Sequence, residues 1–348
     1  MKSLNNMKVK CPKCNNIFYI DEETKKNKPK TILKDNISLP KKNKQKLILT
    51  GGAKQQKKVI IKTVESKLLA SDKLKNKILR QSTALPPMSH IVQQAFAVLD
   101  NSNTSFKDVG NVLEKDQAMA ARILKTANSA YYGLSMPVSS VQQASALLGL
   151  QTIIEIVTVA STSKFMEKTL KGYNLSSRYV WHHSLSVAFG AKTIALAKNK
   201  LLQNDAFSAG LIHDLGKIIL DKYVYKKKED FEIITKDLQE PVHFAEKRIF
   251  GFDHAEIAAD FIKSWKLPKA QINAIKYHHY PSCSDNDVLS YIIHAANSIA
   301  LMDFSLSVND NIKMFMEKGT MEFLKLNEEH IVIIADKVKE FVSKITAK

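Results

Sequence analysis

The chain of 348 residues has an ordinary apolar fraction of 45% and a formal net charge of +18, which is unevenly distributed. Residues 1–80 contain 22 Lys and Arg against 6 Asp and Glu, whereas residues 81–348 contain 30 against 28. The sequence therefore predicts a nearly neutral globular body with a basic arm. Only three cysteines occur, which excludes a disulfide framework. No leader-like or long apolar segment is visible, so we expect a cytoplasmic protein without a transmembrane helix.

Two different segments make up the basic arm. Residues 1–20 are predicted to form a small β-hairpin knuckle, because apolar residues alternate around the CPKC motif of Cys11 and Cys14. Residues 21–75 are rich in Lys and poor in aromatic residues, so we expect a flexible basic linker. Its lysines could give weak, salt-dependent contact with nucleic acid or another anionic surface. A solvated linker is the favoured interpretation, since the few aromatic residues of the arm lie in the knuckle.

The body of the chain, from about residue 76, follows helical periodicity and has few strand signals. A helix is expected after Pro86 and Pro87. Two short helices and one long, Ser-capped central helix should follow, at residues 105–116, 118–133 and 138–165. Further helices are expected at residues 176–199, 204–223, 253–265, 268–280 and 287–302, with two more amphipathic helices within 310–345. The predicted fold class is all-α.

Five of these expected helices each carry one polar, ligand-capable side chain in line with apolar residues at helical spacing. The five residues are His183, Asp214, His254, His279 and Asn297. A single histidine on an apolar face is usually a core residue that is hydrogen-bonded to a carbonyl. Five such faces in succession favour convergence on one interior pocket.

Asp214 gives this pocket its chemistry, because a buried carboxylate needs a cation, a protonated histidine or strong donors. His213 lies about 100° around the same expected helix, so both residues could reach one ion. Imidazole with carboxylate suits a divalent metal such as Zn, Mn or Fe. Gly216 would allow close approach of another segment, and Lys217 could meet a phosphate group.

The remaining histidines are weaker candidates for the pocket. Three histidines do not belong to this set of aligned polar residues, and we expect them at the surface: His90, His243 and His330. His182, His278 and His294 are ambiguous neighbours of the pocket residues, and His278 is the best candidate of these three.

The motifs WHHSLSVA, GLIHDLGK, FGFDHAEIA, WKLP, AIKYHH and HAANSIA occur in this order. They resemble the HDOD family of bacterial signalling proteins, which are relatives of the HD metal-dependent phosphohydrolases. Upstream, LPPMSHIVQQAFAVLD, NSAYYG and VSSVQQASALLGLQ resemble the stretch that distinguishes HDOD domains from plain HD domains. The resemblance covers residues 76–345. It implies a two-lobed helical fold, with an upstream lobe at 76–168 and an HD-like lobe at 169–345, and a regulatory role.

The resemblance also implies roles for individual residues. The first HD histidine would be His183, the HD pair His213 and Asp214, and the final aspartate position Asn297. His254, His278 and His279 would correspond to the additional histidines of HD proteins that hold two metals.

Two departures weaken an enzymatic interpretation. Asn297 replaces a carboxylate with a neutral amide, which is a weaker ligand. The cyclic-dinucleotide phosphodiesterases of the superfamily have a Gly-Tyr-Pro after their histidine pair, whereas this chain has Tyr280 and Pro281 without the glycine.

The N-terminus resembles half of a small bacterial zinc ribbon. Cys11 and Cys14 are present, but the position expected for a second pair has no cysteine. Structural zinc needs four ligands. A decayed knuckle is favoured over a zinc site shared between two chains of a homo-oligomer or a redox-sensitive pair.

Two functions follow from these features. The favoured hypothesis is a regulatory signal-transduction protein that binds a signalling partner or a small ligand through a non-catalytic HDOD domain with a residual metal pocket. The alternative is a metal-dependent phosphohydrolase acting on a nucleotide or cyclic dinucleotide, in which Asp214 and Lys217 are the candidate catalytic residues.

Overall fold

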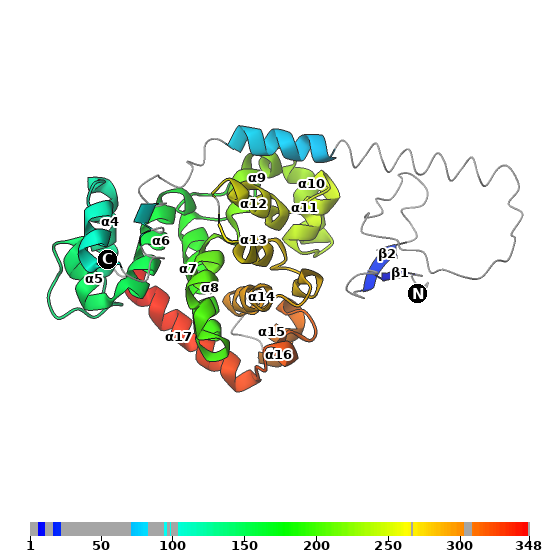
Figure 1. The fold of residues 1–348 in the computed structure, drawn as a ribbon. Coiled ribbons are helices and arrows are strands. Elements are labelled where there is room, and N and C mark those ends of the chain that lie inside the picture. The colour runs from blue at the N-terminus through cyan, green and yellow to red at the C-terminus, as the bar shows by residue number, and fades with distance from the viewer. Residues whose placement is uncertain are drawn as a thin grey trace, which may run out of the picture. The chain divides into compact units, whose positions relative to one another are not determined.

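The computed structural model describes residues 6–10, 17–21, 71–82, 94–95, 98, 104–265, 267–302 and 308–346 (Figure 1). Side chains before residue 71 are not described. The predictions for Cys11, Cys14, Pro86, Pro87, His90 and all of the linker except its two ends therefore lie outside the described residues. The chain divides into two compact units, Met1–Lys77 and Ile78–Lys348, and each is considered by itself.

The first unit contains a two-stranded antiparallel sheet. Strand β1, Asn6–Lys10, pairs with β2, Ile17–Asp21, so that Asn6 lies opposite Asp21 and Lys10 opposite Ile17. This pairing agrees with the β-hairpin predicted for residues 1–20.

The described part of the second unit is helical, as predicted for the all-α fold class. Its first four labelled helices are α3 (Phe106–Leu113), α4 (Gln117–Ala127), α5 (Val141–Leu148) and α6 (Leu150–Met166). Ser105, Asp116 and Ser140 cap α3, α4 and α5 by accepting a backbone N–H in the first turn. These helices bury a shared apolar core that includes Leu113 and Ile123.

The remaining helices form a second group around α7 (Ser177–Lys198). The α-helices that follow it are α8 (Gln203–Ile212), α9 (Leu215–Lys226), α10 (Lys228–Glu232), α11 (Val242–Phe250), α12 (His254–Ile262), α13 (Lys269–Lys276), α14 (Val288–Ala300), α15 (Val308–Phe315), α16 (Thr320–Phe323) and α17 (Glu328–Thr346). Short turns connect them at η3 (Lys200–Leu202), η4 (Ile233–Asp237), η5 (Lys263–Trp265) and η6 (Pro281–Ser284). Helix α7 packs against α8, α14 and α17, and α9 packs against α12 (Figure 1).

Three helix predictions were wrong in their continuity. The single helix expected over residues 138–165 is divided into α5 and α6 at Gly149, whose φ of +81° is incompatible with a helix. The last segment holds α15, α16 and α17 in place of two helices, because Gly319 and Lys325 adopt φ of +89° and +48°.

The third break is at the His213–Asp214 pair, which lies between α8 and α9 and not within one helix. The imidazole of His213 bonds to the carbonyl of Gly210. An uninterrupted helix would use this same carbonyl to accept the N–H of Asp214. The His213 side chain thus competes with the N–H of Asp214 for the carbonyl of Gly210, at the turn between α8 and α9.

None of the described helices combines the length and the apolar character that crossing a lipid bilayer requires.

Candidate metal centre

The carboxylate of Asp214 lies at the centre of the histidine cluster and is 6% exposed. Its Oδ2 atom lies 3.6 Å from Nε2 of His183 and 3.5 Å from Nε2 of His213. Nζ of Lys217, one turn along α9, donates to the same oxygen at 2.6 Å. Helices α7, α8 and α9 therefore bring two imidazoles and one ammonium group to one side of the carboxylate.

The other oxygen of Asp214 faces a second set of histidines. Oδ1 lies 3.2 Å from Nε2 of His254 and 3.9 Å from Nε2 of His278. Nε2 of His279 lies 2.8 Å from Nε2 of His254. His254 is the first residue of α12, whereas His278 and His279 lie in the turn beyond α13.

These contacts define two groups of three that could each hold a metal ion. One group is His183, His213 and Asp214, and the other is His254, His278 and His279. Within each group, one ligand atom per residue lies within 4.8 Å of the others. Asp214 faces both groups through its two oxygens, so the groups share one interior region that we call the Asp214 pocket.

The orientation of two imidazoles is fixed by backbone carbonyls. Nδ1 of His213 lies 2.8 Å from the oxygen of Gly210, and Nδ1 of His278 lies 2.7 Å from the oxygen of Ile275. Because a carbonyl can only accept, each Nδ1 must be the donor, which leaves Nε2 as a lone pair in the neutral ring. Both Nε2 atoms are buried without a hydrogen-bond partner. A ring held by Nδ1–H with Nε2 unused is the arrangement of a metal-ligating histidine.

The protonation state of four histidines fits this arrangement. Burial lowers the pKa of His183 to about 3, with Asp214 opposing the shift. Burial likewise lowers the pKa of His213, His278 and His279. These rings are therefore neutral near pH 7, which is the form that binds a metal.

Asp214, Lys217 and His254 carry the charges of the pocket. Burial alone would raise the pKa of Asp214, but His213, Lys217 and His254 together hold it well below the usual value. Burial would also lower the pKa of His254, yet the Glu246 carboxylate raises it to about 9. In the metal-free chain the pocket thus combines an ionised carboxylate with one protonated and four neutral imidazoles. His254 would release its Nε2 proton on binding a metal.

Asn297 occupies the last position of the predicted ligand set. It lies on α14 and is 7% exposed, and its side chain is close enough to His183 to oppose the lowering of the pKa of that ring. Its Oδ1 atom is buried without a hydrogen-bond partner. The structure therefore brings all seven predicted residues into one region, although four of them lie outside the helices expected for them. His213 and Asp214 lie between α8 and α9. His278 and His279 lie beyond α13, which ends at Lys276, so the expected helical face of His279 with Ile272 and Ile275 is not formed.

Gly216 is required for the close approach predicted from the sequence. A Cβ atom at this position would lie 1.9 Å from the carbonyl oxygen of His254. Helix α9 can therefore pack against the start of α12 only because residue 216 has no side chain. This contact places Asp214 and His254 next to each other.

The prediction that His243 lies at the surface was wrong. It is half-buried on α11, its ring stacks on His279 with centroids 4.0 Å apart, and its Nε2 lies 3.0 Å from the hydroxyl of Tyr280. Burial lowers its pKa to about 3. His330 is exposed as expected, and His182 is half-buried beside the pocket histidine His183.

His294 has a supporting position next to the pocket. Its Nε2 accepts the backbone N–H of Glu317, so its Nδ1 is the donor to the carbonyl of His278 at 2.7 Å. Both ring nitrogens are therefore used in holding the backbone, and His294 has no lone pair for an ion.

Two further residues were missed by the sequence analysis. Glu246 on α11 is fully buried and accepts from His254, and Tyr173 donates to Glu246 at 2.6 Å. Glu246 lies one helical turn before the buried Phe250, so a carboxylate on an apolar face was the available signal. Tyr173 offered no such signal, because it lies in a turn before α7.

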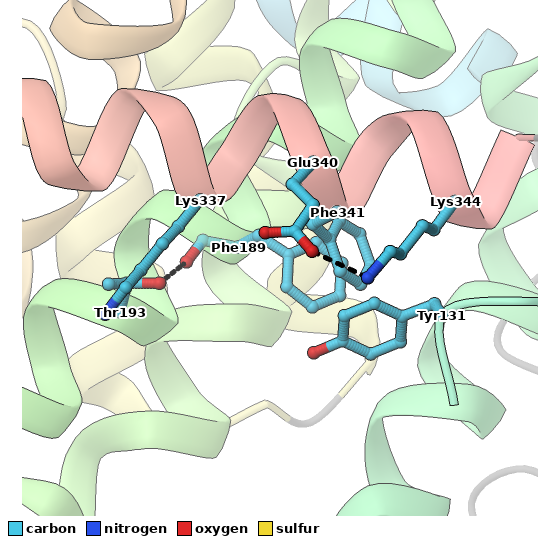
Figure 2. Close-up of a pocket in the computed structure, with 7 residues that line it drawn as sticks. All are labelled: Tyr131, Phe189, Thr193, Lys337, Glu340, Phe341 and Lys344. Carbon is cyan, nitrogen blue, oxygen red and sulfur yellow. Dashed lines mark hydrogen bonds and ion pairs between the residues drawn. The ribbon is translucent and has the colours of Figure 1, made fainter. Parts of the chain in front are cut away.

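A separate pocket of about 230 Å³ lies between the turn after α4 and helices α7 and α17 (Figure 2). Its lining consists of aromatic rings below a charged rim, formed by Tyr131, Phe189, Thr193, Lys337, Glu340, Phe341 and Lys344. None of these residues belongs to the Asp214 pocket.

Comparison with known proteins identifies the family. The HDOD domain matches residues 85–281, which is more than half of the chain. The chain belongs to the HDOD domain family. This match confirms the HDOD resemblance of the motifs within residues 85–281.

The similar proteins come from several bacteria. An uncharacterized protein of Treponema pallidum (strain Nichols) is 22% identical over 220 residues, which is 63% of this chain and 41% of that protein. The chain therefore spans less than half the length of this curated relative. The crystal structure of an HDOD domain protein with unknown function from Geobacter sulfurreducens has a TM-score of 0.65 at 22% identity, covering 79% of this chain and 99% of that chain.

A provisionally named phosphohydrolase from Shewanella amazonensis has a TM-score of 0.59 at 21% identity, covering 78% of this chain and 98% of that chain. A provisionally named signal transduction protein from Marinobacter aquaeolei has a TM-score of 0.58 at 19% identity, covering 80% and 64%. At these identities the similarity establishes the fold.

Proposed function

We propose that this chain is a bacterial regulatory protein whose HDOD domain holds a divalent metal in the Asp214 pocket and signals by binding a partner or small ligand. The observation that carries the metal is the pair of buried imidazole lone pairs, on His213 and His278, that have no hydrogen-bond partner. Leaving such atoms unpaired costs about 1–3 kcal/mol each, which a bound cation would offset.

The donor set suits a transition metal better than calcium or magnesium. His183, His213 and Asp214 would form one ligand group, and His254, His278 and His279 the other. Imidazole nitrogen with one carboxylate is the ligand chemistry of Zn, Mn or Fe. When bound, such an ion would supply positive charge that the Asp214 carboxylate offsets, while the imidazoles would donate lone pairs from separate segments.

Three features favour a structural role of the metal over a role in hydrolysis. His213, His254 and His278 are fully buried, whereas a catalytic metal needs an open position for substrate. Lys217 is paired with Asp214 at 2.6 Å, so its ammonium is engaged within the pocket. Asn297 supplies an amide where a hydrolytic HD site would have a carboxylate.

Metal-dependent hydrolysis of a nucleotide or cyclic dinucleotide is the second candidate. It is favoured by the three additional histidines His254, His278 and His279, since these could hold a second ion near the first. In that case Asp214 would hold the metal, and Lys217 would leave Asp214 to contact a substrate phosphate.

Elemental analysis of the purified full chain tests the first proposal. We expect about one equivalent or more of a transition metal in the wild type and none in Asp214→Ala. Asp260→Ala, which removes a carboxylate on the outer part of α12, is the control and should keep the metal. A wild type that takes up no metal from Zn, Mn or Fe solutions would contradict the proposal.

The same preparations decide between the two functions. Metal-loaded wild type should leave nucleotides and cyclic dinucleotides intact. Hydrolysis by the wild type that is lost in Asp214→Ala would establish the second candidate in place of the first.

The basic arm is proposed to act separately from the pocket, as a solvated linker to the HDOD body of residues 76–345. Weak contact of its lysines with nucleic acid or another anionic surface is the alternative. Weaker retention of DNA on a gel after deletion of residues 1–75 would support this alternative, and unchanged retention would remove it.

A further inference from the structure

Glu246 is a buried carboxylate next to the Asp214 pocket that the proposed function does not use. Its Oε2 accepts the backbone N–H of His254 at 2.7 Å and the Nδ1–H of the same residue at 2.7 Å. Its Oε1 accepts the hydroxyl of Tyr173 at 2.6 Å. The side chain is fully buried, and these donors come from two separate segments.

We propose that Glu246 is a positioning residue for the metal pocket. It holds the Nδ1–H of His254, so that Nε2 of this ring faces Asp214 and His279, and Tyr173 holds Glu246 in turn. This inference rests on the proposed function, because His254 is one of the proposed metal ligands.

The hydrogen bond to the ring separates this role from simple helix capping. A residue that only capped α12 would need to accept the backbone N–H of His254, which Oε2 does. The same oxygen also bonds to Nδ1 and thereby determines which nitrogen of the ring is left for the pocket. Nε2 lies 3.2 Å from Oδ1 of Asp214 and 2.8 Å from Nε2 of His279 as a result.

The charge of this partner sets His254 apart from the other oriented rings. His213 and His278 donate their Nδ1–H groups to neutral carbonyls, whereas His254 donates to a carboxylate. An anionic partner makes an imidazole a stronger electron donor to a metal. His254 should therefore be the ligand whose loss of outer support weakens metal binding most.

The connection between α11 and α12 holds Glu246 in place. Gly251 ends α11 with a φ of +90°, and Asp253 caps α12 by accepting the N–H of Glu256. Lys247, the neighbour of Glu246, forms an ion pair with Asp253 at 3.1 Å. This short connection fixes the distance between a carboxylate on one helix and the first residue of the next.

Two substitutions separate the acceptor of Glu246 from its charge. Glu246→Gln keeps an oxygen for His254 but removes the charge, and Glu246→Leu removes both. We expect Zn²⁺ affinity, measured by competition with a chromophoric chelator, to fall about tenfold in Gln and about 100-fold in Leu. The Zn²⁺ affinity of Tyr173→Phe should fall less than that of Glu246→Gln. Glu155→Gln, which changes a buried carboxylate paired with Lys192 outside the pocket, should bind as the wild type does.

A spectroscopic measurement reports the ring directly. With ¹¹³Cd in place of zinc and ¹⁵N-labelled histidine, the coupling of His254 to the ion should appear at Nε2 in the wild type and in Glu246→Gln. In Glu246→Leu it should be lost or transferred to Nδ1. Wild-type affinity in both Glu246 variants, with the coupling still at Nε2, would overturn the proposal. If Glu246→Leu does not fold, Glu246→Gln and Tyr173→Phe decide by the same criteria.

Failure of the metal proposal itself would be recognised separately. If the wild type binds neither Zn²⁺ nor Cd²⁺, the proposed function fails. The positioning role is then judged from the Nδ1–H resonance of His254 in the metal-free chain. Its loss in Glu246→Leu but not in Glu155→Gln supports the role, and its persistence in Glu246→Leu contradicts it.

Discussion

The core of helices α3–α6 and the core of helices α7–α14 differ in the polarity of their buried side chains. The first is apolar, and its buried hydroxyls on Ser145, Thr158 and Thr162 donate to carbonyls one turn back in their own helices. The second contains fully buried Glu246, which accepts from Tyr173 and His254 of other segments, and fully buried His213, whose Nε2 atom has no hydrogen-bond partner. Because buried polar groups cost stability, the second core supports the proposed metal, whereas the first needs no ligand.

The junction between these groups has a third character. Glu155 on α6 is 2% exposed and forms an ion pair with Lys192 on α7. Burial raises the pKa of Glu155, and Lys192 opposes the shift. Tyr131, which lines the pocket of Figure 2, packs its ring against Phe189 of α7 and Phe341 of α17. The NSAYYG motif that distinguishes the HDOD family therefore lies where the two groups of helices meet.

The largest effect should come from damage to the apolar core. Ile123→Ala removes a fully buried side chain of α4, and we expect the free energy of unfolding to fall by about 2–5 kcal/mol in urea denaturation. Metal affinity should stay within about twofold of the wild type, because distant sites act additively. A parallel loss of metal binding in the folded protein would show that the two cores are not independent.

A neighbouring pair of histidines tests the second core. His183 is 8% exposed beside Asp214, whereas its neighbour His182 is half-buried. His183→Gln should weaken Zn²⁺ binding by about 100-fold or more, since even the loss of an outer partner costs about 10- to 100-fold. Both affinities are measured by calorimetric titration, in which His182→Gln should leave the Zn²⁺ affinity unchanged. Equal effects of both substitutions would place the metal elsewhere.

The sequence predicted part of the pocket and missed the rest. Helical spacing located His183, His254 and Asn297 correctly, because each lies within or at the start of a regular helix. It could not foresee the break at His213, where a side chain takes a carbonyl from the helix. His243 and Glu246 were missed because their importance depends on how α11 packs, and periodicity does not contain that contact.

Gly216 offers a smaller test that links backbone packing to the ligands. Gly216→Ala would place Cβ 1.9 Å from the oxygen of His254, so α12 must shift away from α9. We expect about 1–3 kcal/mol of destabilisation and about a tenfold loss of Zn²⁺ affinity. The measurements are urea denaturation and chelator competition.

Gly190→Ala is the matched control for this change. Its Cβ would lie 3.3 Å from the side chain of Ala296, between α7 and α14 and away from His254. It should cost some stability and leave the affinity for Zn²⁺ as it is. If both glycine variants lose affinity equally, the pocket responds to general loosening of the helices and not to the position of α12.

The smallest effect is expected at Asn297, where the polar core has a neutral group in place of a charge. Asn297→Asp should tighten Zn²⁺ binding about tenfold, equivalent to about 1.4 kcal/mol. In the metal-free chain it should lower stability, because the new carboxylate is buried at a position only 7% exposed. Opposite signs with and without metal are the signature of a group that faces the ion. Asn204→Asp, at a partly buried position of α8 that bonds to Gln151, should change neither affinity nor its dependence on metal. Unchanged affinity in Asn297→Asp would put residue 297 outside the coordination sphere, whereas a gain of phosphate-ester hydrolysis would mean that this amide alone separates the binding protein from an enzyme.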